Sequence, residues 1–129
     1  MRRWPAALLA LLIAGQAAAS GSWVSEPPAL RISLVDRDSV SAPLIPPAVV
    51  PAGAEITRVR WRFEAPPGDL PALRLCQGNR CVPLTAARGI SEAMDGAAAD
   101  RPLRLHGRLP PGRRGALTLG GIQLIIDYR

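Results

Sequence analysis

The feature that most constrains the fold of this chain is the stretch LRLCQGNRCVPL, residues 73–84, which holds its two cysteines. Cys76 and Cys81 flank Gly78-Asn79, and glycine at the first central position favours a type II′ turn in a two-residue β-hairpin. In that register the two cysteines face each other as a non-hydrogen-bonded pair, with Cα atoms about 4.5 Å apart. A disulfide accepts Cα separations down to roughly 4.4 Å. We therefore predict a Cys76–Cys81 disulfide across this hairpin.

The two faces of this hairpin differ in character. Leu75 and Val82 point away from the cysteines, so their face should meet the core. Pro83 lacks an N–H and occupies a position where that N–H would point away from the partner strand. Proline within a sheet is confined to such positions, so the strand that contains Pro83 should form a sheet edge.

Residues 1–19 have the pattern of a secretory signal peptide. Arg2 and Arg3 precede an apolar run over residues 4–14, and Ala17–Ala19 supplies the small residues of a cleavage site. The run is well short of the ~20 residues that span a bilayer. We therefore predict cleavage before Ser20, one mature domain over residues 20–129 with no membrane span, and an oxidising compartment in which a disulfide persists.

The residues that could carry chemistry are few. A metal pair is the alternative to the disulfide, but two cysteines cannot complete a tetrahedral zinc site and His106 is the single histidine. His106 has no serine or cysteine nucleophile placed for it, and the acidic residues are scattered. No glycine-rich phosphate loop is present. We expect no metal, no cofactor and no catalysis, so the domain should work by binding.

The remaining sequence predicts an all-β domain. Short apolar runs with two-residue alternation are broken by 14 prolines and 12 glycines, which is typical of a sandwich or a partly open barrel. Residues 43–51 should be an extended surface connection, and residues 86–100 would allow a short helix. The last residues should form a hairpin, 117–119 and 122–128, about Gly120-Gly121. The expected strands before that hairpin begin near Trp23 and cover residues 30–34, 39–42, 55–65, 73–84 and 103–109.

The clearest expected strand, Glu55–Ala65, alternates between an apolar and a charged face. The apolar face carries Trp61 and should be buried. If this strand paired with residues 73–76, Arg74 would join its charged face. The predicted core positions are Val59, Trp61, Phe63, Leu75, Val82, Leu103, Leu105, Leu124 and Ile126. The candidate partner-binding face is Arg58, Arg60, Arg62 and Arg74.

The charge of the chain is positive, with 16 arginines and no lysine against 10 acidic residues and a formal net charge of +6. A basic secreted domain suits an anionic lipid or an acidic protein surface. We do not expect nucleic acid as a partner after export.

The order of motifs resembles the flagellar protein FlhE family over nearly the whole mature chain. The matching features are Trp23, Trp61-Arg62-Phe63, Leu75-Cys76 to Arg80-Cys81-Val82, Ala97-Ala98-Ala99 followed by Pro102-Leu103-Arg104, and the C-terminal Tyr128-Arg129. The chain departs from the family in Pro83, in the proline-rich residues 43–51 and in its heavy use of arginine.

The resemblance implies a periplasmic, single-domain antiparallel β-sandwich of the flagellar system that is not an enzyme. Its partners would be proteins of the export gate or basal body. It would limit proton leakage through the flagellar type III export apparatus or act as a chaperone of flagellar parts. The alternative function is a secreted β-sandwich that binds cell-wall glycan or another anionic ligand, with Trp23 and the arginines as its contacts.

Overall fold

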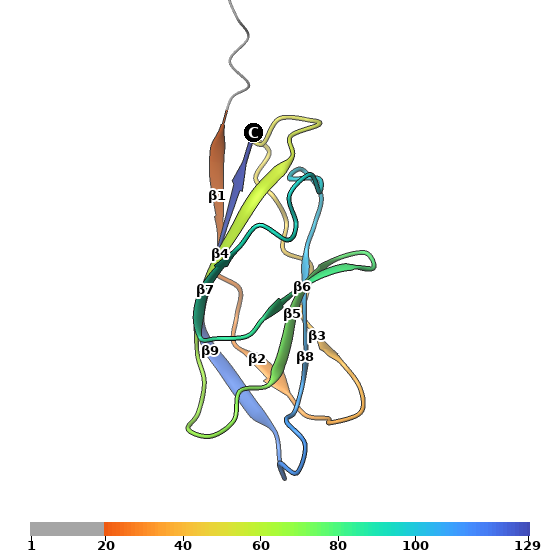
Figure 1. Cartoon of the computed structure of the whole chain (residues 1–129), viewed down its shortest axis with the longest axis vertical. Coiled ribbons are helices and arrows are strands. Elements are labelled where there is room, and N and C mark those ends of the chain that lie inside the picture. Colours follow the sequence, from red (N-terminus) through yellow and green to blue (C-terminus); the bar gives the residue numbers. More distant parts are fainter. Residues whose placement is uncertain (1–19) are drawn as a thin grey trace, which may run out of the picture.

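Two antiparallel β-sheets packed face to face form the structure, a computed structural model that describes residues 20–129 (Figure 1). The first sheet has the strand order β1-β9-β4-β7, and β2 pairs with the other end of β9. The second sheet has the order β3-β8-β5-β6. The strands are β1 Gly21–Ser25, β2 Leu30–Ile32, β3 Ser39–Val40, β4 Ile56–Glu64, β5 Ala72–Gln77, β6 Arg80–Leu84, β7 Arg88–Ser91, β8 Arg104–Arg108 and β9 Leu117–Tyr128. The predicted all-β sandwich is confirmed, while the predicted signal peptide lies outside the described residues.

The cysteine hairpin forms as expected from strands β5 and β6. Cys76 is the register partner of Cys81, their Cα atoms are 4.0 Å apart, and the disulfide joins them. Gly78 has a φ of +58° and Asn79 does not have a positive φ, as in a type II′ turn. Strand β6 ends its sheet, which confirms the edge position predicted from Pro83.

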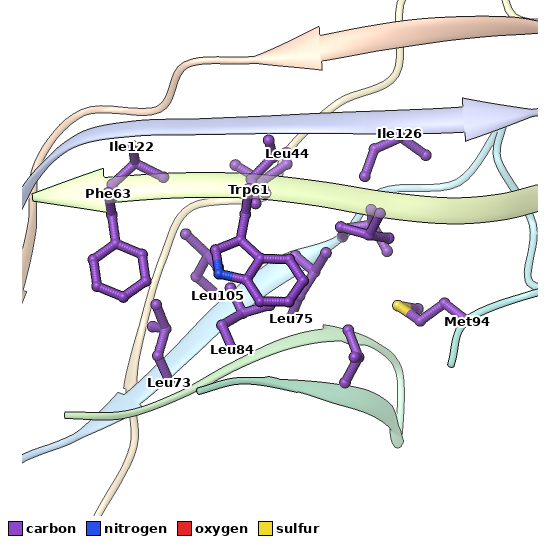
Figure 2. Close-up of a cluster of buried hydrophobic side chains, with 14 of the residues drawn as sticks. Leu44, Trp61, Phe63, Leu73, Leu75, Leu84, Met94, Leu105, Ile122 and Ile126 are labelled. Carbon is purple, nitrogen blue, oxygen red and sulfur yellow. The ribbon is translucent and has the colours of Figure 1, made fainter. Parts of the chain in front are cut away.

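The core lies between the two sheets, and all nine predicted core positions are buried. Trp61 and Phe63 point from β4 toward leucines of the opposite sheet (Figure 2). The Trp61 indole also packs beneath β7, where a Cβ on Gly89 would lie 2.3 Å from its Cζ2 atom. Glycine at position 89 therefore lets the edge strand approach the largest core side chain.

The predicted C-terminal hairpin is wrong, because residues 117–128 form one strand, β9. Its register with β4 shifts between the pairs Arg62–Gln123 and Glu64–Gly120, so β9 carries an extra residue there. Gly121 has a φ of +55°, which identifies a glycine bulge. The bulge keeps Leu119 and Ile122 on the same buried face, and β9 lies inside its sheet, between β1 and β4.

The pairing considered between β4 and β5 is also wrong. Strand β4 pairs with β9 and β7, whereas β5 pairs with β8 and β6. The turn after β4 carries the chain from one sheet to the other. Arg74 of β5 therefore lies on the second sheet, away from the three arginines of β4. This arrangement avoids placing arginines of β4 and β5 opposite each other, which would be destabilising.

Residues 86–100 and residues 43–51 both differ from what the sequence predicted. Within residues 86–100, Arg88–Ser91 forms β7 and the rest consists of turns, with Met94 fully buried; residues 20–129 contain no helix. Within residues 43–51, Leu44 is buried and bridges Leu103. The proline-rich connection is thus anchored to the core, not laid wholly on the surface.

Candidate functional site

The outer face of the first sheet carries most of the arginines expected to form a binding face. Arg58, Arg60 and Arg62 project from β4, as their alternation with buried residues predicted. Strand β9 places Asp127 beside Arg58, Ile125 beside Arg60 and Gln123 beside Arg62. Strand β7 adds Ile90 beside Arg60 and Arg88 beside Arg62. Each arginine of β4 therefore has a different set of cross-strand neighbours.

Asp127 forms ion pairs with two of these arginines. Its carboxylate accepts a hydrogen bond of 2.6 Å from Arg58 Nε and bonds of 3.0 and 2.8 Å from Arg60 Nε and Nη2. The Ser22 hydroxyl also donates to it. Burial by itself would raise the pKa of Asp127, but the hydrogen bonds from Arg60, Ser22 and Arg58 outweigh burial and lower the pKa to about 2. The carboxylate is thus ionised at neutral pH and fixes both guanidinium groups.

Arg62 and Arg88 form a contrasting pair. They are exposed register partners on adjacent strands, and within residues 20–129 neither makes an ion pair with a carboxylate. Arg62 Nε donates to Gln123 Oε1 at 3.1 Å, a neutral partner. Both arginines line an open hollow of about 580 Å³, and Trp61 and Ile90 are among its other lining residues. This hollow therefore combines uncompensated positive charge with apolar surface.

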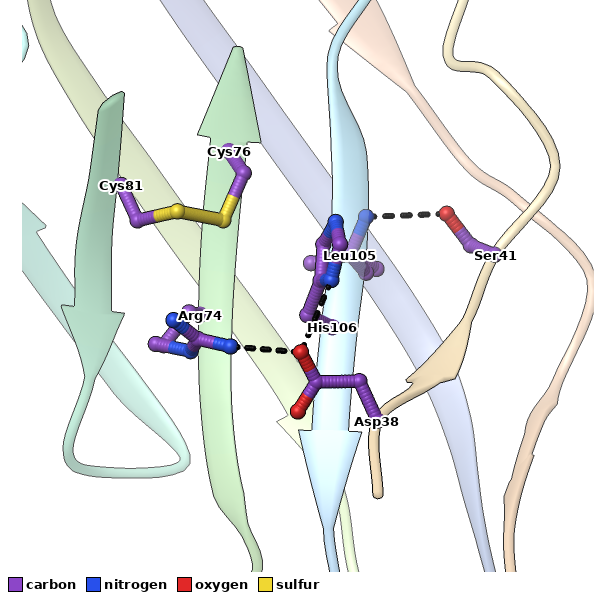
Figure 3. The surroundings of a disulfide bond; sticks show 7 residues. All are labelled: Asp38, Ser41, Arg74, Cys76, Cys81, Leu105 and His106. Carbon is purple, nitrogen blue, oxygen red and sulfur yellow. Dashed lines mark hydrogen bonds and ion pairs between the residues drawn. A yellow bond between two sulfur atoms is a disulfide. The ribbon is translucent and has the colours of Figure 1, made fainter. Parts of the chain in front are cut away.

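The second sheet holds a separate charged cluster around Asp38, which lies between β2 and β3 (Figure 3). Asp38 accepts hydrogen bonds from Arg108 Nε at 2.6 Å and from Arg74 Nη2 at 2.7 Å, and His106 Nδ1 lies 3.2 Å away. The Arg108 hydrogen bond is the main cause of a lowered pKa for Asp38, against the opposing effect of burial. Arg74 is thus paired with Asp38, and His106 lies beside the same carboxylate.

Sequence reasoning missed the residues that distinguish these arginines from one another. Asp127 is the one acidic residue of the last strand, and alternation places it on the same face as Gln123 and Ile125. Its neighbours on adjacent strands, however, depend on which strands pair. Arg88 lies within residues 86–100, for which the sequence allowed a short helix. Arg88 and Ile90 nevertheless alternate about Gly89 with the two-residue period of a strand.

The proposed glycan contact through Trp23 is not supported. Trp23 is 3% exposed and packs in the core, and the other aromatic residues that the structure describes, Trp61, Phe63 and Tyr128, are buried too. Residues 20–129 thus offer no exposed aromatic platform for a sugar ring. In the same residues no helix is long and apolar enough to cross a membrane.

Fold and surface together define a small disulfide-containing β-sandwich with arginine-rich outer faces. A model of the family described as "Flagellar protein FlhE" matches residues 31–129. The chain belongs to this family, which makes it a flagellar accessory protein.

Individual relatives agree with this assignment. The flagellar protein FlhE of Salmonella typhimurium is 34% identical over 134 residues, which cover 100% of both chains. The protein of the same name from Escherichia coli is 33% identical over 128 residues and covers 95% of this chain and 96% of its own. A solved structure described as "Crystal Structure of FLHE" has a TM-score of 0.73, with 30% sequence identity over 87% of this chain and 99% of the other.

Proposed function

We propose that this protein works in the periplasm as a non-catalytic binding partner of the flagellar export apparatus and limits proton leakage through it. The observation that carries the proposal is the full-length similarity to FlhE proteins. The Cys76–Cys81 disulfide supports an oxidising compartment. The binding role is supported by the arginines that the outer faces of both sheets display.

The contact face within this proposal is the outer face of the first sheet, with Arg58, Arg60 and Arg62. Arg74, the fourth candidate, lies on the other sheet and is engaged by Asp38, so it would belong to a separate contact. Clustered guanidinium groups attract acidic surfaces of a partner and speed encounter with them. They also hydrogen-bond carboxylates in a bidentate manner.

Deletion of the gene in the bacterium that encodes it tests the proposal. Cells that are building flagella should acidify their cytoplasm, as read by a pH-sensitive fluorescent protein, because protons would enter through the unguarded export gate. Removal of the export gate as well should restore the pH. A copy that lacks residues 1–19 should fail to complement the deletion, since the protein would stay in the cytoplasm.

An unchanged cytoplasmic pH in the deletion strain would contradict the leak function. If flagellar parts instead accumulated or aggregated in the periplasm, the same strain would show the chaperone function. A normal pH restored by the copy without residues 1–19 would contradict the periplasmic location.

A further inference from the structure

Two kinds of arginine occupy the outer sheet faces. Asp127 engages Arg58 and Arg60, and Asp38 engages Arg74 and Arg108. The register pair Arg62–Arg88 instead places two like charges opposite each other, which costs stability unless an anion lies between them. Glu26 and Glu64 line neighbouring hollows, but within residues 20–129 neither arginine makes an ion pair with a carboxylate, so the pair is open to a carboxylate from outside.

Strand β7 also leaves backbone groups without a strand partner. The Phe63 N–H donates to the Ala87 carbonyl at 2.8 Å, which makes Phe63 and Ala87 a hydrogen-bonded pair. Hydrogen-bonded and non-hydrogen-bonded pairs alternate along an antiparallel ladder. The pairs Arg62–Arg88 and Arg60–Ile90 are therefore of the second kind. The N–H and C=O groups of Arg88 and Ile90 point away from β4, at the free end of the sheet.

This open edge is held in a fixed conformation. Trp61 Nε1 donates to the Ala86 carbonyl at 2.9 Å, just before β7 begins. Gly89 lies against the Trp61 ring with no room for a Cβ. Ile90, on the outer face, is 58% exposed. An edge that is already ordered loses little entropy when another strand pairs with it.

We propose that the free edge of β7 binds an extended acidic segment of a partner protein by strand addition. Backbone groups of the segment would pair with Arg88 and Ile90, as in other cases of β-augmentation. In the added strand, side chains opposite Arg88 and Ile90 would lie on the outer face, and acidic residues there would bind the Arg62 and Arg88 guanidinium groups. The alternate side chains would lie on the side of Gly89 and Trp61 and would be apolar.

Charge complementarity selects this partner over other strands. Arginine on an edge disfavours pairing with neutral or basic strands, a device that proteins use against aggregation. The same arginine favours an acidic strand, so one residue both disfavours unsuitable strands and attracts the acidic partner. Strand β1 also ends this sheet, but Asp127 already engages the two arginines nearest to it, Arg58 and Arg60. Its edge offers an acidic segment no comparable attraction.

A binding measurement on the purified mature chain tests the proposal. The probe is a fluorescein-labelled octapeptide of alternating valine and glutamate, titrated by fluorescence anisotropy, with the valine–glutamine peptide as its matched control. We expect the glutamate peptide to bind and the glutamine peptide to bind about tenfold more weakly or not at all. Hydrogen exchange should show new protection of the Arg88 and Ile90 amides in the complex.

Two variants separate charge from strand addition. The double variant Arg62→Gln/Arg88→Gln should weaken binding about tenfold. The matched control Arg37→Gln/Arg101→Gln removes the same charge from exposed loop positions and should bind like the unchanged protein. Ile90→Pro removes the outward N–H without removing a bond to β4, and it should weaken binding while the thermal unfolding midpoint stays close to that of the parent.

Several results would overturn the proposal. They are equal binding by Arg62→Gln/Arg88→Gln, equal binding by a folded Ile90→Pro, or binding without protection of the two amides. Binding to phosphatidylglycerol vesicles that requires Arg62 and Arg88, with no binding of the peptide, would assign the pair to a membrane surface instead.

The inference rests on the binding role proposed above, but the two can fail separately. Peptide binding in a protein whose deletion leaves cytoplasmic pH unchanged would keep the edge site and remove the leak function. A deletion strain that acidifies and is fully rescued by Arg62→Gln/Arg88→Gln would keep the leak function and remove the edge site.

Discussion

Strands β6 and β7 follow one another in the chain and each ends a sheet, but their free edges differ. In β6, Pro83 pairs with Arg74 two residues from the disulfide-linked pair, so it falls at a non-hydrogen-bonded position and removes the N–H that would face outward. In β7, Ile90 holds the equivalent kind of position and keeps its N–H. The edge of β6 has a proline where one outward N–H would be, whereas the edge of β7 keeps its outward N–H groups and is lined by arginine.

The difference shows that the two edge strands are not protected against further strand pairing in the same way. At β6 a proline removes one outward N–H, whereas β7, with the sequence Arg88–Ser91, contains no proline. The open edge coincides with the arginine pair that lacks a carboxylate. Four predictions test this comparison between β6 and β7.

Trp61→Ala should have the largest effect, because the indole supports β7 from beneath. Loss of the buried ring and of its hydrogen bond to Ala86 should lower the free energy of unfolding by about 3–5 kcal/mol. Urea denaturation measures the loss, and hydrogen exchange should show that amides of β7 lose more protection than those of β6. A loss under about 1 kcal/mol would mean that the ring does not support the edge.

Replacement of Cys76 and Cys81 by serine should weaken β6 instead. The closed ring is short, so the loss should be roughly 2 kcal/mol without loss of the fold. Thiol titration of the denatured, unreduced parent protein should find no free thiol. Two free thiols would contradict the disulfide.

Acid should weaken the ion pairs of Arg58 and Arg60 with Asp127, but it should not affect Arg62 and Arg88. The pKa of Asp127 falls from 3.8 to about 2 on folding. A depressed pKa stabilises the folded protein at pH values above the unfolded pKa, and this stabilisation disappears as pH falls through the folded value. The shift corresponds to about 2 kcal/mol.

The free energy of unfolding should therefore fall between about pH 4 and pH 2, and Asp127→Asn should flatten this part of the profile. Arg62→Gln, on the same face but outside the Asp127 cluster, is the matched control and should leave the acid dependence in place. Parallel profiles for Asp127→Asn and the parent would show that the cluster does not contribute.

Arg88→Gln should have the smallest effect, and it should be stabilising. Removal of one of two facing like charges should raise the free energy of unfolding by about 0.2–0.5 kcal/mol at low salt, and added salt should reduce the gain. Arg60→Gln, which breaks the pairing with Asp127, should be destabilising under the same conditions. A loss of stability in Arg88→Gln would mean that the arginine pair has an internal partner.

Sequence patterns correctly predicted the features that depend only on residues close together in the chain. The alternation in residues 55–65 identified the buried face of β4, because side chains on a strand alternate whatever the strand pairs with. The turn at Gly78-Asn79 determined the register of the disulfide, because both strands are contiguous in sequence. The outward position of Arg58, Arg60 and Arg62 follows from the same alternation.

Features that depend on distant partners could not be predicted in this way. Glycine with a positive φ suits both a hairpin turn and a bulge, and Gly120-Gly121 forms a bulge because β2 and β4 pair with the two sides of it. Arg74 lies on the second sheet because its strand, β5, pairs with β8 and not with β4. Arg62 pairs with Arg88 through β7, a four-residue strand whose alternation does not indicate which strand it pairs with.

The position of β9 has a consequence for the timing of folding. This strand follows β1, β2 and β4 in sequence, and it lies at the centre of the first sheet and pairs with all three. Ribosomes make a chain from its N-terminus, so these three strands are made before the strand that pairs with them. Pairing of such distant segments is slow, and until β9 is made the chain exposes apolar strands to aggregation and proteolysis.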